Sequence, residues 1–528
     1  NLKSDVGFYD LGLDSNALMS IGEALESKVQ TKIYPTLLFE YPTIGELVDY
    51  LYDNYKEQYI LDIELPIIKA PKPIHVKKNI EFTKNNQTLV TDSDSDNFAI
   101  VGLQGRFPQS ENMNQFWENL EKGKNCIESI PLNRWDHTEF YSNQRKNIYK
   151  TNSQSGGFVK DIDLFDPLFF KLSGREAERI DPQERCFLEM AYATMDDAGY
   201  TGSKYKSLMN EHENKIGVFV GVMWNTYGWN ALEQSVGKNY EISSPFTFSI
   251  ANRVSHFFDF KGPSYVVDSA CSSSLLAIHR ACEEIKSGSC KWALAGGVNL
   301  ATHPSKYVFL SQFGMISPGD KNYSFSEHAD GYVPGEGVGC MLIKSLRDAI
   351  KHGDHIYGVI KGSAVNHGGK SAGYSVPNPN AQEAVIRESL AKANVLPEQI
   401  SYIEAHGTGT SLGDPIEINA LLKVFKDRAN PLLVGSVKSN IGHLESASGI
   451  AGVAKVLQQF KHGKIAPSIH ADQLNKQIDF GNNDIEIATK LQNWQPSLNP
   501  KGELSRIAGV SSFGAGGTNV HVILEQAP

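Results

Sequence analysis

Residues 266–282 read VVDSACSSSLLAIHRAC, and this stretch predicts a strand, a tight turn and a helix in succession. The apolar run that ends near Asp268 predicts a buried strand, the tiny residues from Ser269 to Ser274 predict the turn, and the apolar residues after them recur at helical spacing. Similar continuous apolar runs, rich in Val, Ile and Ala, return along the chain from Phe98 onward. Because such runs are typical of strands that helices cover on both faces, they predict the α/β fold class.

The apolar runs fall into two groups along the chain. One group ends near Leu342 and the other begins near His355. This grouping predicts two similar α/β halves packed together, at about residues 97–350 and 351–528, although no residue-level repeat is visible. The runs start at residues 98, 216, 264, 292, 355, 400, 432, 507 and 520.

The first part of the chain has a different pattern of apolar residues. Apolar residues recur at helical spacing between Ala17 and Val29, and Thr43 precedes a second helical pattern. Residues 1–55 therefore predict a small helical segment, which has no room for a first helix and is expected to be part of a domain. Residues 56–96 predict a linker, because they end in a polar run that cannot bury a core.

Composition excludes several classes of protein. The chain has 528 residues, of which 41% are hydrophobic and 21% charged, and these values argue against disorder, collagen and coiled coil. The net charge is -10 and no Lys/Arg cluster is interleaved with aromatic residues, so we expect no nucleic-acid partner. No membrane span or signal peptide is visible, so we expect a cytoplasmic protein. The 6 cysteines form no CxxC pair, so we expect free thiols and no zinc site.

Cys271 is the first candidate for chemistry. It lies on the predicted strand-to-helix turn, where free backbone amides and the helix dipole would stabilise a thiolate and could bind an oxyanion. These properties favour a nucleophile. A small buried cysteine that only packs between a helix and a sheet fits the same residues, and this motif alone leaves the two interpretations equal.

Two histidines lie on predicted turns of the same type. EAHGTGTSLGDPIE, residues 404–417, places His406 at the end of a strand, and GSVKSNIGHLESASGIAG, residues 435–452, places His443 before a helix. A thiol-based acyl-transfer site needs such groups, because a thioester carbonyl must be polarised and a proton managed nearby. Taken singly, His406 could be a core imidazole and His443 a helix cap. Both together beside a cysteine turn favour an active site.

A glycine-rich segment, SSFGAGGTN at residues 511–519, lies between two predicted strands. It could supply backbone amides close to the reacting atoms, or it could form a plain turn. Neither this segment nor GTGTSLG has the GxGxxG order that opens a helix, and GxxxxGK[ST] does not occur. Nucleotide binding is therefore disfavoured.

Together, DSACSSSL, EAHGTGT, KSNIGH and SSFGAGGTN resemble the four signatures of the β-ketoacyl synthase domains of modular polyketide synthases. The resemblance covers about residues 97–528, and the joint occurrence of the motifs in this order is highly specific. It implies a thiolase-like fold of two fused α/β halves, usually as a homodimer. NHGGKSAGYSVPNPNAQ, which starts at residue 366, looks like the form found in synthases that receive extender units from a separate acyltransferase.

The resemblance also implies an activity. Cys271 would take the growing acyl chain as a thioester, while His406 and His443 would promote decarboxylation of a malonyl unit on acyl carrier protein and stabilise the resulting enolate. The carbanion would then attack the thioester, which is a decarboxylative Claisen condensation in polyketide biosynthesis, antibiotic biosynthesis included. No metal or cofactor is implied for the ketosynthase itself, and no cysteine follows Cys340, which argues against the related thiolases that use a second cysteine.

Further residues receive supporting roles by the same resemblance. Lys438 orients the region of His443, and the backbone amides of Cys271 and Ala515 form an oxyanion hole. The other positions that the resemblance implies are Asn440 in support of the site, and Thr408, Thr410 and Phe513 in substrate binding, with the two threonines on the pantetheine arm.

The leading segment resembles the later part of an acyl carrier protein. FYDLGLDSNALM places Ser15 after Gly-Leu-Asp at a helix start, where the family attaches 4'-phosphopantetheine, and YPTLLFEYPTIGELVDYL at residue 34 matches the end of such a domain. Ser15 also fits a plain N-cap serine. The expected partners are acyl carrier protein domains, adjacent polyketide synthase modules and the separate acyltransferase.

Three other functions stay open on the sequence. The first is a non-elongating synthase that only passes acyl groups between carrier proteins, and the presence of both His406 and His443 weighs against it. The second is a scaffold with a vestigial site that docks carrier proteins. The third is a Cys/His hydrolase.

Overall fold

The computed structural model consists of two units, Asn1–Ser95 and Asp96–Pro528, and each is described by itself. Nearly all of the predicted linker, residues 56–96, lies outside the described residues. None of the helices in the described part of the chain combines the length and apolar character needed to cross a membrane. The structure describes residues 4–8, 11–13, 15–29, 33, 37–59, 97–144, 147, 149–202, 214–235, 246–371, 373–478, 480 and 484–528.

The first unit contains the two helical patterns of the sequence, with a short helix between them. Thr43 and Glu46 form a reciprocal cap at the start of the last helix, because the Glu46 amide donates to Thr43 Oγ1 and the Thr43 amide donates to Glu46 Oε2, each at 3.2 Å. The small core between the helices includes Leu18, Leu38 and Phe39. The helices are α1 (Ser15–Val29), α2 (Leu37–Glu40) and α3 (Ile44–Tyr59).

The second unit contains an 11-stranded mixed sheet whose spatial order is β12-β10-β9-β16-β17-β8-β1-β7-β6-β4-β5. All nine apolar runs of the sequence form strands of this sheet. The strands are β1 (Phe98–Arg106), β4 (Ile216–Gly221), β5 (Ser264–Val267), β6 (Trp292–Asn299), β7 (Gly337–Ser345), β8 (Gly358–His367), β9 (Tyr402–Glu404), β10 (Leu432–Gly435), β12 (Ile485–Ile487), β16 (Ile507–Phe513) and β17 (Thr518–Gln526).

The sheet repeats one topology in two halves. From the centre outward the first half runs β1-β7-β6-β4-β5, and the second runs β8-β17-β16-β9-β10. The pairings correspond step by step, with two antiparallel pairs followed by two parallel pairs in each half. β1 and β8 join the halves as an antiparallel pair in which Phe98 lies opposite Ile360. The structure therefore confirms the thiolase-like arrangement of two fused α/β halves.

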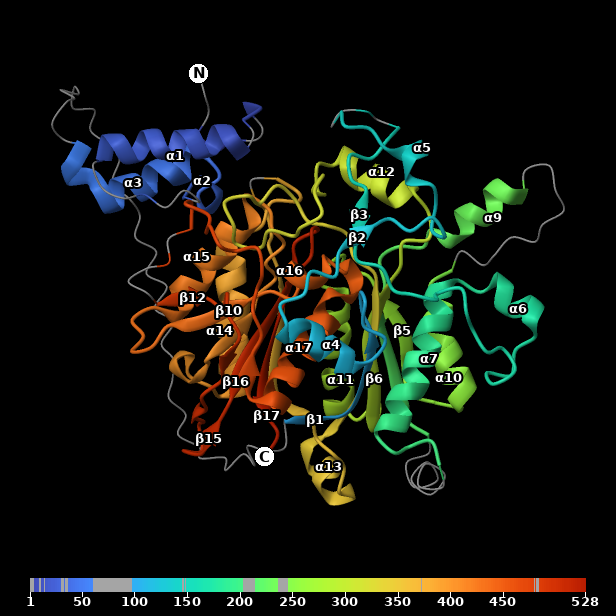
Figure 1. Cartoon of the computed structure of the whole chain (residues 1–528). Helices are drawn as coiled ribbons and strands as arrows, with labels where there is room; N and C mark the ends of the chain where they lie inside the picture. The colour runs from blue at the N-terminus through green and yellow to red at the C-terminus, as the bar shows by residue number, and fades with distance from the viewer. Residues whose placement is uncertain are drawn as a thin grey trace. The chain divides into compact units, whose positions relative to one another are not determined.

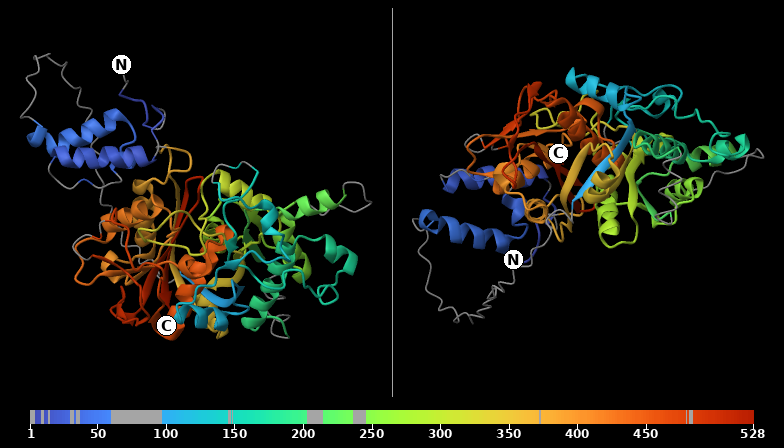
Figure 2. Two further views of the ribbon diagram at one scale, coloured as in Figure 1. Left: turned by 45° about the horizontal axis from the view of Figure 1, so that its top comes forward. Right: turned by 90° about the horizontal axis from the view of Figure 1, so that it is seen from below.

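Helices cover both faces of each half, as the continuous apolar runs predict. α7 (Pro182–Asp197) and α10 (Phe248–Phe258) pack on the outer face of the first half, and α14 (Pro379–Ala393) and α15 (Gly413–Phe425) pack on that of the second half. In Figures 1 and 2 the first half, coloured cyan to yellow, lies beside the second half, coloured orange to red.

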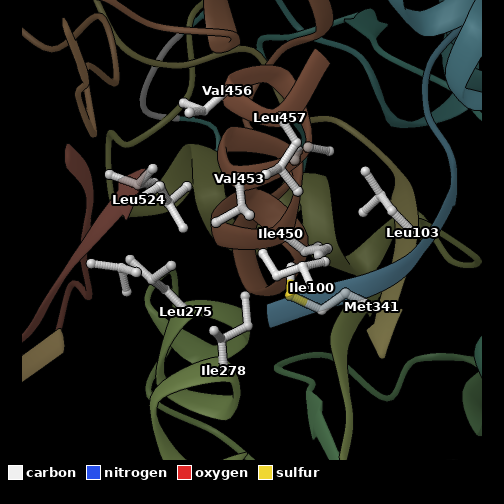
Figure 3. Close-up of a cluster of buried hydrophobic side chains, with 14 of the residues drawn as sticks. Ile100, Leu103, Leu275, Ile278, Met341, Ile450, Val453, Val456, Leu457 and Leu524 are labelled. Carbon is white, nitrogen blue, oxygen red and sulfur yellow. The ribbon is translucent and has the colours of Figure 1, made fainter. Parts of the chain in front are cut away.

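Two central helices, α11 (Ser273–Lys286) and α17 (Ser448–His462), share the largest apolar cluster. Figure 3 shows Leu275 and Ile278 of α11 facing the same cluster as Ile450 and Val453 of α17. Burial of each such side chain stabilises the fold by about 1.5–3 kcal/mol. Because α11 and α17 each follow a strand of a different half, their packing brings the turns before them together.

The turns after β5, β9, β10 and β16 carry the candidate site residues, since they follow the carboxyl ends of strands in one sheet. The remaining elements are α4 (Met113–Glu121), β2 (Glu128–Ser129), α5 (His137–Phe140), β3 (Ser155–Gly156), α6 (Gly174–Arg179), α9 (Tyr227–Ser235), α12 (Ser305–Gln312), α13 (Leu346–His352), η2 (Pro397–Gln399), α16 (Lys438–Ile441), η3 (Glu445–Ala447), β11 (Lys464–Ile465), β13 (Gln492–Asn493), β14 (Ser497–Leu498) and β15 (Leu504–Ser505).

Candidate active site

Cys271 lies on a tight turn between the end of β5 and the start of α11. Ala270 takes a left-handed conformation there, with φ +56°, which turns the chain sharply before the thiol. The Cys271 carbonyl accepts hydrogen bonds from the hydroxyls of Ser448 and Ser512, each at 2.9 Å. These two serines come from α17 and β16, so the second half of the fold holds the backbone of the cysteine turn.

The structure brings Cys271, His406 and His443 together. The sulfur and one ring nitrogen of each histidine all lie within 4.8 Å of one another. The centroids of the two imidazole rings are 5.4 Å apart and their planes meet at 83°. All three side chains are buried, with 7%, 9% and 1% of their surface exposed. A single thioester in this space would meet all three groups.

Burial raises the pKa of the Cys271 thiol to about 12, and the nearby Glu445 carboxylate adds to the rise. Lys438 and the backbone amides of Ala515 and Cys271 act in the opposite direction. The amides act in the direction that the helix start predicts, but burial raises the pKa by more than they lower it. The resting cysteine is a thiol, and its proton must leave when it reacts.

His443 is held in one tautomer. The backbone N–H of Glu445 donates to His443 Nδ1 at 3.0 Å, so in the neutral ring the proton is on Nε2. Burial lowers the His443 pKa well below its usual value, and the charge of Lys438 adds to this. His443 Nε2 is buried and finds no hydrogen-bond partner among the described residues. His443 is thus a neutral donor with an N–H available to a ligand.

His406 is fixed through its backbone rather than through its ring. The amides of His406 and Gly407 donate to the two carboxylate oxygens of Glu417 at 2.7 and 2.8 Å. Burial, followed by the charge of Lys438, lowers the pKa of the His406 ring well below its usual value. His406 Nδ1 has no partner among the described residues. The ring is neutral, and no hydrogen bond of its Nδ1 commits it to one tautomer.

Buried carboxylates around Lys438 are the functional residues that the sequence reasoning missed. Glu417 holds the turn of His406, and Asp414 accepts the Gly409 amide, while Glu404 accepts the Val437 amide at 2.6 Å. Burial raises the pKa of Asp414 to about 6 and also lowers the pKa of Lys438. The acidic residues of EAHGTGTSLGDPIE were a usable signal, since carboxylates within a buried strand-turn-helix stretch need partners.

The glycine-rich turn between β16 and β17 supplies an amide at the thiol. The backbone amides of Ala515 and of Cys271 itself lie close enough to the Cys271 sulfur to lower the pKa of its thiol. A Cβ on Gly514 would lie 2.3 Å from the Ser269 carbonyl oxygen, so only glycine allows this turn to approach the cysteine turn. Two backbone amides beside the nucleophile are what an oxyanion hole requires.

The other predicted residues lie at different distances from the chemistry. Phe513 packs its ring against His406, with centroids 5.7 Å apart. The hydroxyls of Thr408 and Thr410 are 3.0 Å apart on the turn after His406 and are partly exposed. Asn440 donates to the Lys124 carbonyl at 3.1 Å, so its side chain braces a neighbouring loop.

Cys271, His406 and His443 also offer three atoms of the kind that bind zinc. A zinc ion would bind the thiolate form of Cys271, whereas burial favours the thiol. The charge of Lys438 lowers the pKa of all three groups.

Family models match three segments of the chain. The model described as "Beta-ketoacyl synthase, N-terminal domain" matches residues 95–349, and "Beta-ketoacyl synthase, C-terminal domain" matches residues 357–472. The model "Phosphopantetheine attachment site" matches residues 1–51. Ser15 opens helix α1 within that segment, and a helix start is the backbone position at which the sequence pattern places the attachment.

Curated relatives are long polyketide synthases. Polyketide synthase PksL of Bacillus subtilis is 46% identical over 99% of this chain, and polyketide synthase ThaG of Burkholderia thailandensis is 40% identical over 99%. The chain spans 12% and 10% of the length of these two relatives.

Solved structures with the same fold are ketosynthases. The oxazolomycin ketosynthase domain OzmH KS7 of Streptomyces albus JA3453 is 44% identical, with a TM-score of 0.78 over 82% of this chain and 76% of that chain. The ketosynthase from module 6 of the bacillaene synthase of Bacillus subtilis 168 is 38% identical, with a TM-score of 0.74 over 82% of this chain and 72% of that chain.

Proposed function

We propose, for a chain that belongs to the β-ketoacyl synthase family, that Cys271 carries the acyl chain while His406 and His443 drive its extension. The protein is a ketosynthase, an enzyme of the acyltransferase class that performs condensation in polyketide biosynthesis. The observation that supports these residue roles is the convergence of one thiol and two neutral imidazoles within 4.8 Å.

Acyl transfer to Cys271 is the first step of the proposed mechanism. The sulfur bonds to the thioester carbonyl carbon, the carrier's thiolate leaves, and the proton lost by Cys271 ends on that leaving sulfur. The negative charge that develops on the carbonyl oxygen is stabilised by the amides of Cys271 and Ala515, which already face the sulfur. His406 can pass the proton, because its ring is neutral and its Nδ1 is unpartnered among the described residues.

Condensation is the second step. His406 and His443 promote loss of carbon dioxide from the malonyl thioester. The electron pair of the broken C–C bond becomes an enolate, whose oxygen accepts a hydrogen bond from the His443 Nε2–H. The enolate carbon then bonds to the acyl carbonyl carbon, and the bond from that carbon to the Cys271 sulfur breaks. The electron pair of this bond stays on the sulfur, which takes up a proton from solvent and returns to the thiol. Loss of carbon dioxide creates the carbanion without a strong base, so neutral imidazole donors suffice.

A labelled extender tests this proposal. The acylated full chain is mixed with carrier protein that bears malonyl labelled in its free carboxyl group, and labelled carbon dioxide and β-ketoacyl product are measured. Both should form at equal amounts. Acyl transfer without either product would reject elongation and leave a transfer-only enzyme, free acid as the main product would indicate a hydrolase, and carrier binding without acyl transfer would indicate a scaffold.

The carrier-protein side of the proposal rests on Ser15 and on the threonines. Ser15 would carry 4'-phosphopantetheine, and Thr408 and Thr410 would hydrogen-bond the arm of an incoming carrier, since their hydroxyls are partly exposed beside His406. Treatment with coenzyme A and a phosphopantetheinyl transferase should add one arm to the chain and none to the Ser15→Ala variant. Addition to that variant would remove Ser15 from the proposal.

Assembly and context form the remaining part of the proposal. The domains would be a carrier segment at 1–55, a linker at 56–96 and a ketosynthase at 97–528, in a cytoplasmic assembly line that makes an antibiotic-type polyketide with a separate acyltransferase. A homodimer is supported by β5, an edge strand of the sheet whose residues are partly exposed. Light scattering should give twice 58.2 kDa. A mass of one chain would reject the dimer.

A further inference from the structure

Three buried polar side chains surround Glu445, the residue whose backbone amide holds His443. Tyr332 donates its hydroxyl to Glu445 Oε1 at 3.1 Å, and Asn299 Nδ2 donates to Glu445 Oε2 at 3.1 Å. Lys306 forms an ion pair with the same carboxylate and donates to Asn299 Oδ1 at 2.9 Å. We call Glu445, Lys306, Asn299 and Tyr332 the Glu445 cluster.

The Glu445 cluster is closed to solvent. Glu445 and Asn299 are 0% exposed, Lys306 1% and Tyr332 7%. A buried carboxylate and a buried ammonium are each costly unless they are paired and hydrogen-bonded, and this pair is both. Burial and the Glu445 charge raise the pKa of Tyr332 well above its usual value, so the hydroxyl keeps its proton and remains a donor. The cluster is a fixed arrangement at neutral pH.

The backbone of Glu445 is held in a conformation that a non-glycine residue seldom adopts. Its φ is +47°, in the left-handed region, and such a conformation persists only where the surroundings impose it. This conformation is the one in which the Glu445 amide donates to His443 Nδ1 at 3.0 Å. The anchored carboxylate offsets the strain, because rotating the backbone would pull it from its partners.

Tyr332 connects the cluster directly to the imidazole. Its ring meets the His443 ring with centroids 4.7 Å apart and planes at 67°. The backbone following Tyr332 also pairs with His443, since the His443 amide donates to the Val333 carbonyl and the Gly335 amide donates to the His443 carbonyl, each at 2.8 Å. His443 is therefore held at its backbone, at its ring face and at Nδ1.

We propose that Glu445 is a positioning residue, whose anchored carboxylate fixes the backbone amide that keeps His443 an Nε2–H donor. Glu445 acts through His443, while its side chain is bonded to the other members of the cluster. The consequence for condensation rests on the proposed function, whereas the effect on the tautomer does not. The motif KSNIGH and the residues around it predicted no role for Glu445.

The charge of Glu445 allows a positioning role to be distinguished from a role in fold stability alone. Glu445 is close enough to Cys271 to raise the pKa of its thiol, so its neutral replacement should make the thiol react more readily. Loss of the His443 tautomer should at the same time slow condensation. A residue that only stabilises the fold would lower both rates together.

The test uses Glu445→Gln and Tyr332→Phe in the full chain. Asp354→Asn and Tyr200→Phe are matched controls, because Tyr200 donates to Asp354 and Lys344 pairs with it in a second buried cluster. Lys344 lies near the end of β7, whereas Gly337 at the start of that strand packs against Leu444 beside His443. The control variants therefore remove the same kinds of hydrogen bond and ion pair at a distance from the active site.

Two rates are measured on folded protein, labelled carbon dioxide release per acylated enzyme and acylation of Cys271. In Glu445→Gln and Tyr332→Phe, carbon dioxide release should fall by about tenfold or more. Acylation should not fall in either variant and should rise in Glu445→Gln. The control variants should keep both rates within about threefold. Equal losses of both rates, or no loss of carbon dioxide release in either variant, would overturn the proposal.

A spectroscopic readout keeps the inference independent of turnover. ¹⁵N NMR of histidine-labelled protein reports the tautomer, and a His443→Gln variant identifies the signal. Wild type should show the Nε2–H form, and Glu445→Gln should show a mixture of the two tautomers or exchange between them. An unchanged Nε2–H signal in Glu445→Gln would overturn the inference, whether or not wild type condenses. Failure of wild type to release carbon dioxide would instead count against the proposed function alone.

Discussion

His406 and His443 meet with their ring centroids 5.4 Å apart and their planes at 83°, yet they are held in different ways. Nδ1 of His443 accepts the Glu445 amide, which leaves one N–H as a donor. Nδ1 of His406 has no partner in the described part of the chain. His443 is therefore fixed as an Nε2–H donor, whereas no hydrogen bond at Nδ1 fixes the tautomer of the His406 ring.

The raised pKa of Cys271 predicts its reactivity with pH. Since burial raises this pKa to about 12, the thiolate fraction in the folded protein should grow about tenfold per pH unit from pH 7 to pH 10. The rate of iodoacetamide alkylation of Cys271, followed by peptide mass spectrometry, should rise in parallel with no plateau. A plateau near pH 8 would show that a low-pKa thiolate exists, as the helix-start argument alone suggested.

Buried thiols also predict a loss of stability in alkali. The unfolded thiols ionise near 9.0, whereas the folded protein keeps these protons to higher pH, so rising pH above 9 favours the unfolded chain. Cys340, whose pKa burial raises to about 12, should contribute roughly 1.4 kcal/mol of this loss at pH 10. Urea unfolding at pH 8 and 10 should show a smaller drop for Cys340→Ala than for wild type. Equal drops would contradict the assignment.

The glycine-rich turn predicts a contrast between two neighbouring substitutions. A Cβ at Gly514 would lie 2.3 Å from the Ser269 carbonyl oxygen, so Gly514→Ala should displace the Ala515 amide from the sulfur. Loss of one oxyanion donor lowers a rate by about 10²–10³, and acylation of Cys271 should fall by that order. Gly516→Ala is the control, because its Cβ would meet only the Tyr374 hydroxyl at 3.6 Å. Similar rates for both variants would exclude the amide from the chemistry.

Replacement of Glu417 is predicted to lower both stability and activity. Its two oxygens accept the amides of His406 and Gly407, and a glutamine would present an NH₂ group to one of them. Glu417→Gln should lower the free energy of unfolding by about 1.5–3 kcal/mol and slow condensation. Glu388→Gln, which removes an exposed pair with Lys392, should change stability by less than about 0.5 kcal/mol. Urea unfolding and carbon dioxide release measure both, and a neutral effect of Glu417→Gln would contradict its role.

The sequence allowed the strands of the fold to be predicted but not their pairing. Each of the nine apolar runs became a strand, because continuous Val, Ile and Ala runs are a local signal of burial. Two strands of the sheet, β7 (Gly337–Ser345) and β12 (Ile485–Ile487), were not among these runs, and β7 starts within the glycine-rich GEGVGC. The repeated order of the two halves depends on pairing between distant strands, and it leaves no residue-level trace.

The candidate site, too, could be predicted only in part from the sequence. Cys271, His406 and His443 could be chosen because each lies on a turn with a local signature, and the structure brings them together. The sign of the Cys271 pKa shift could not be predicted, because burial is produced by segments from both halves of the fold. The carboxylate of Glu445 was missed because its side-chain partners are distant in sequence. That of Glu417 was missed although its partners, the amides of His406 and Gly407, lie in the same motif.

The most direct test of the account is intact-protein mass spectrometry after exposure to an acyl thioester. Wild type and Cys290→Ala, which removes another buried thiol, should each gain one acyl mass, and peptide mapping should place it on Cys271. Cys271→Ala should gain none. An acyl mass on folded Cys271→Ala, or on any other residue of wild type, would contradict the claim that this thiol carries the chain between the two imidazoles.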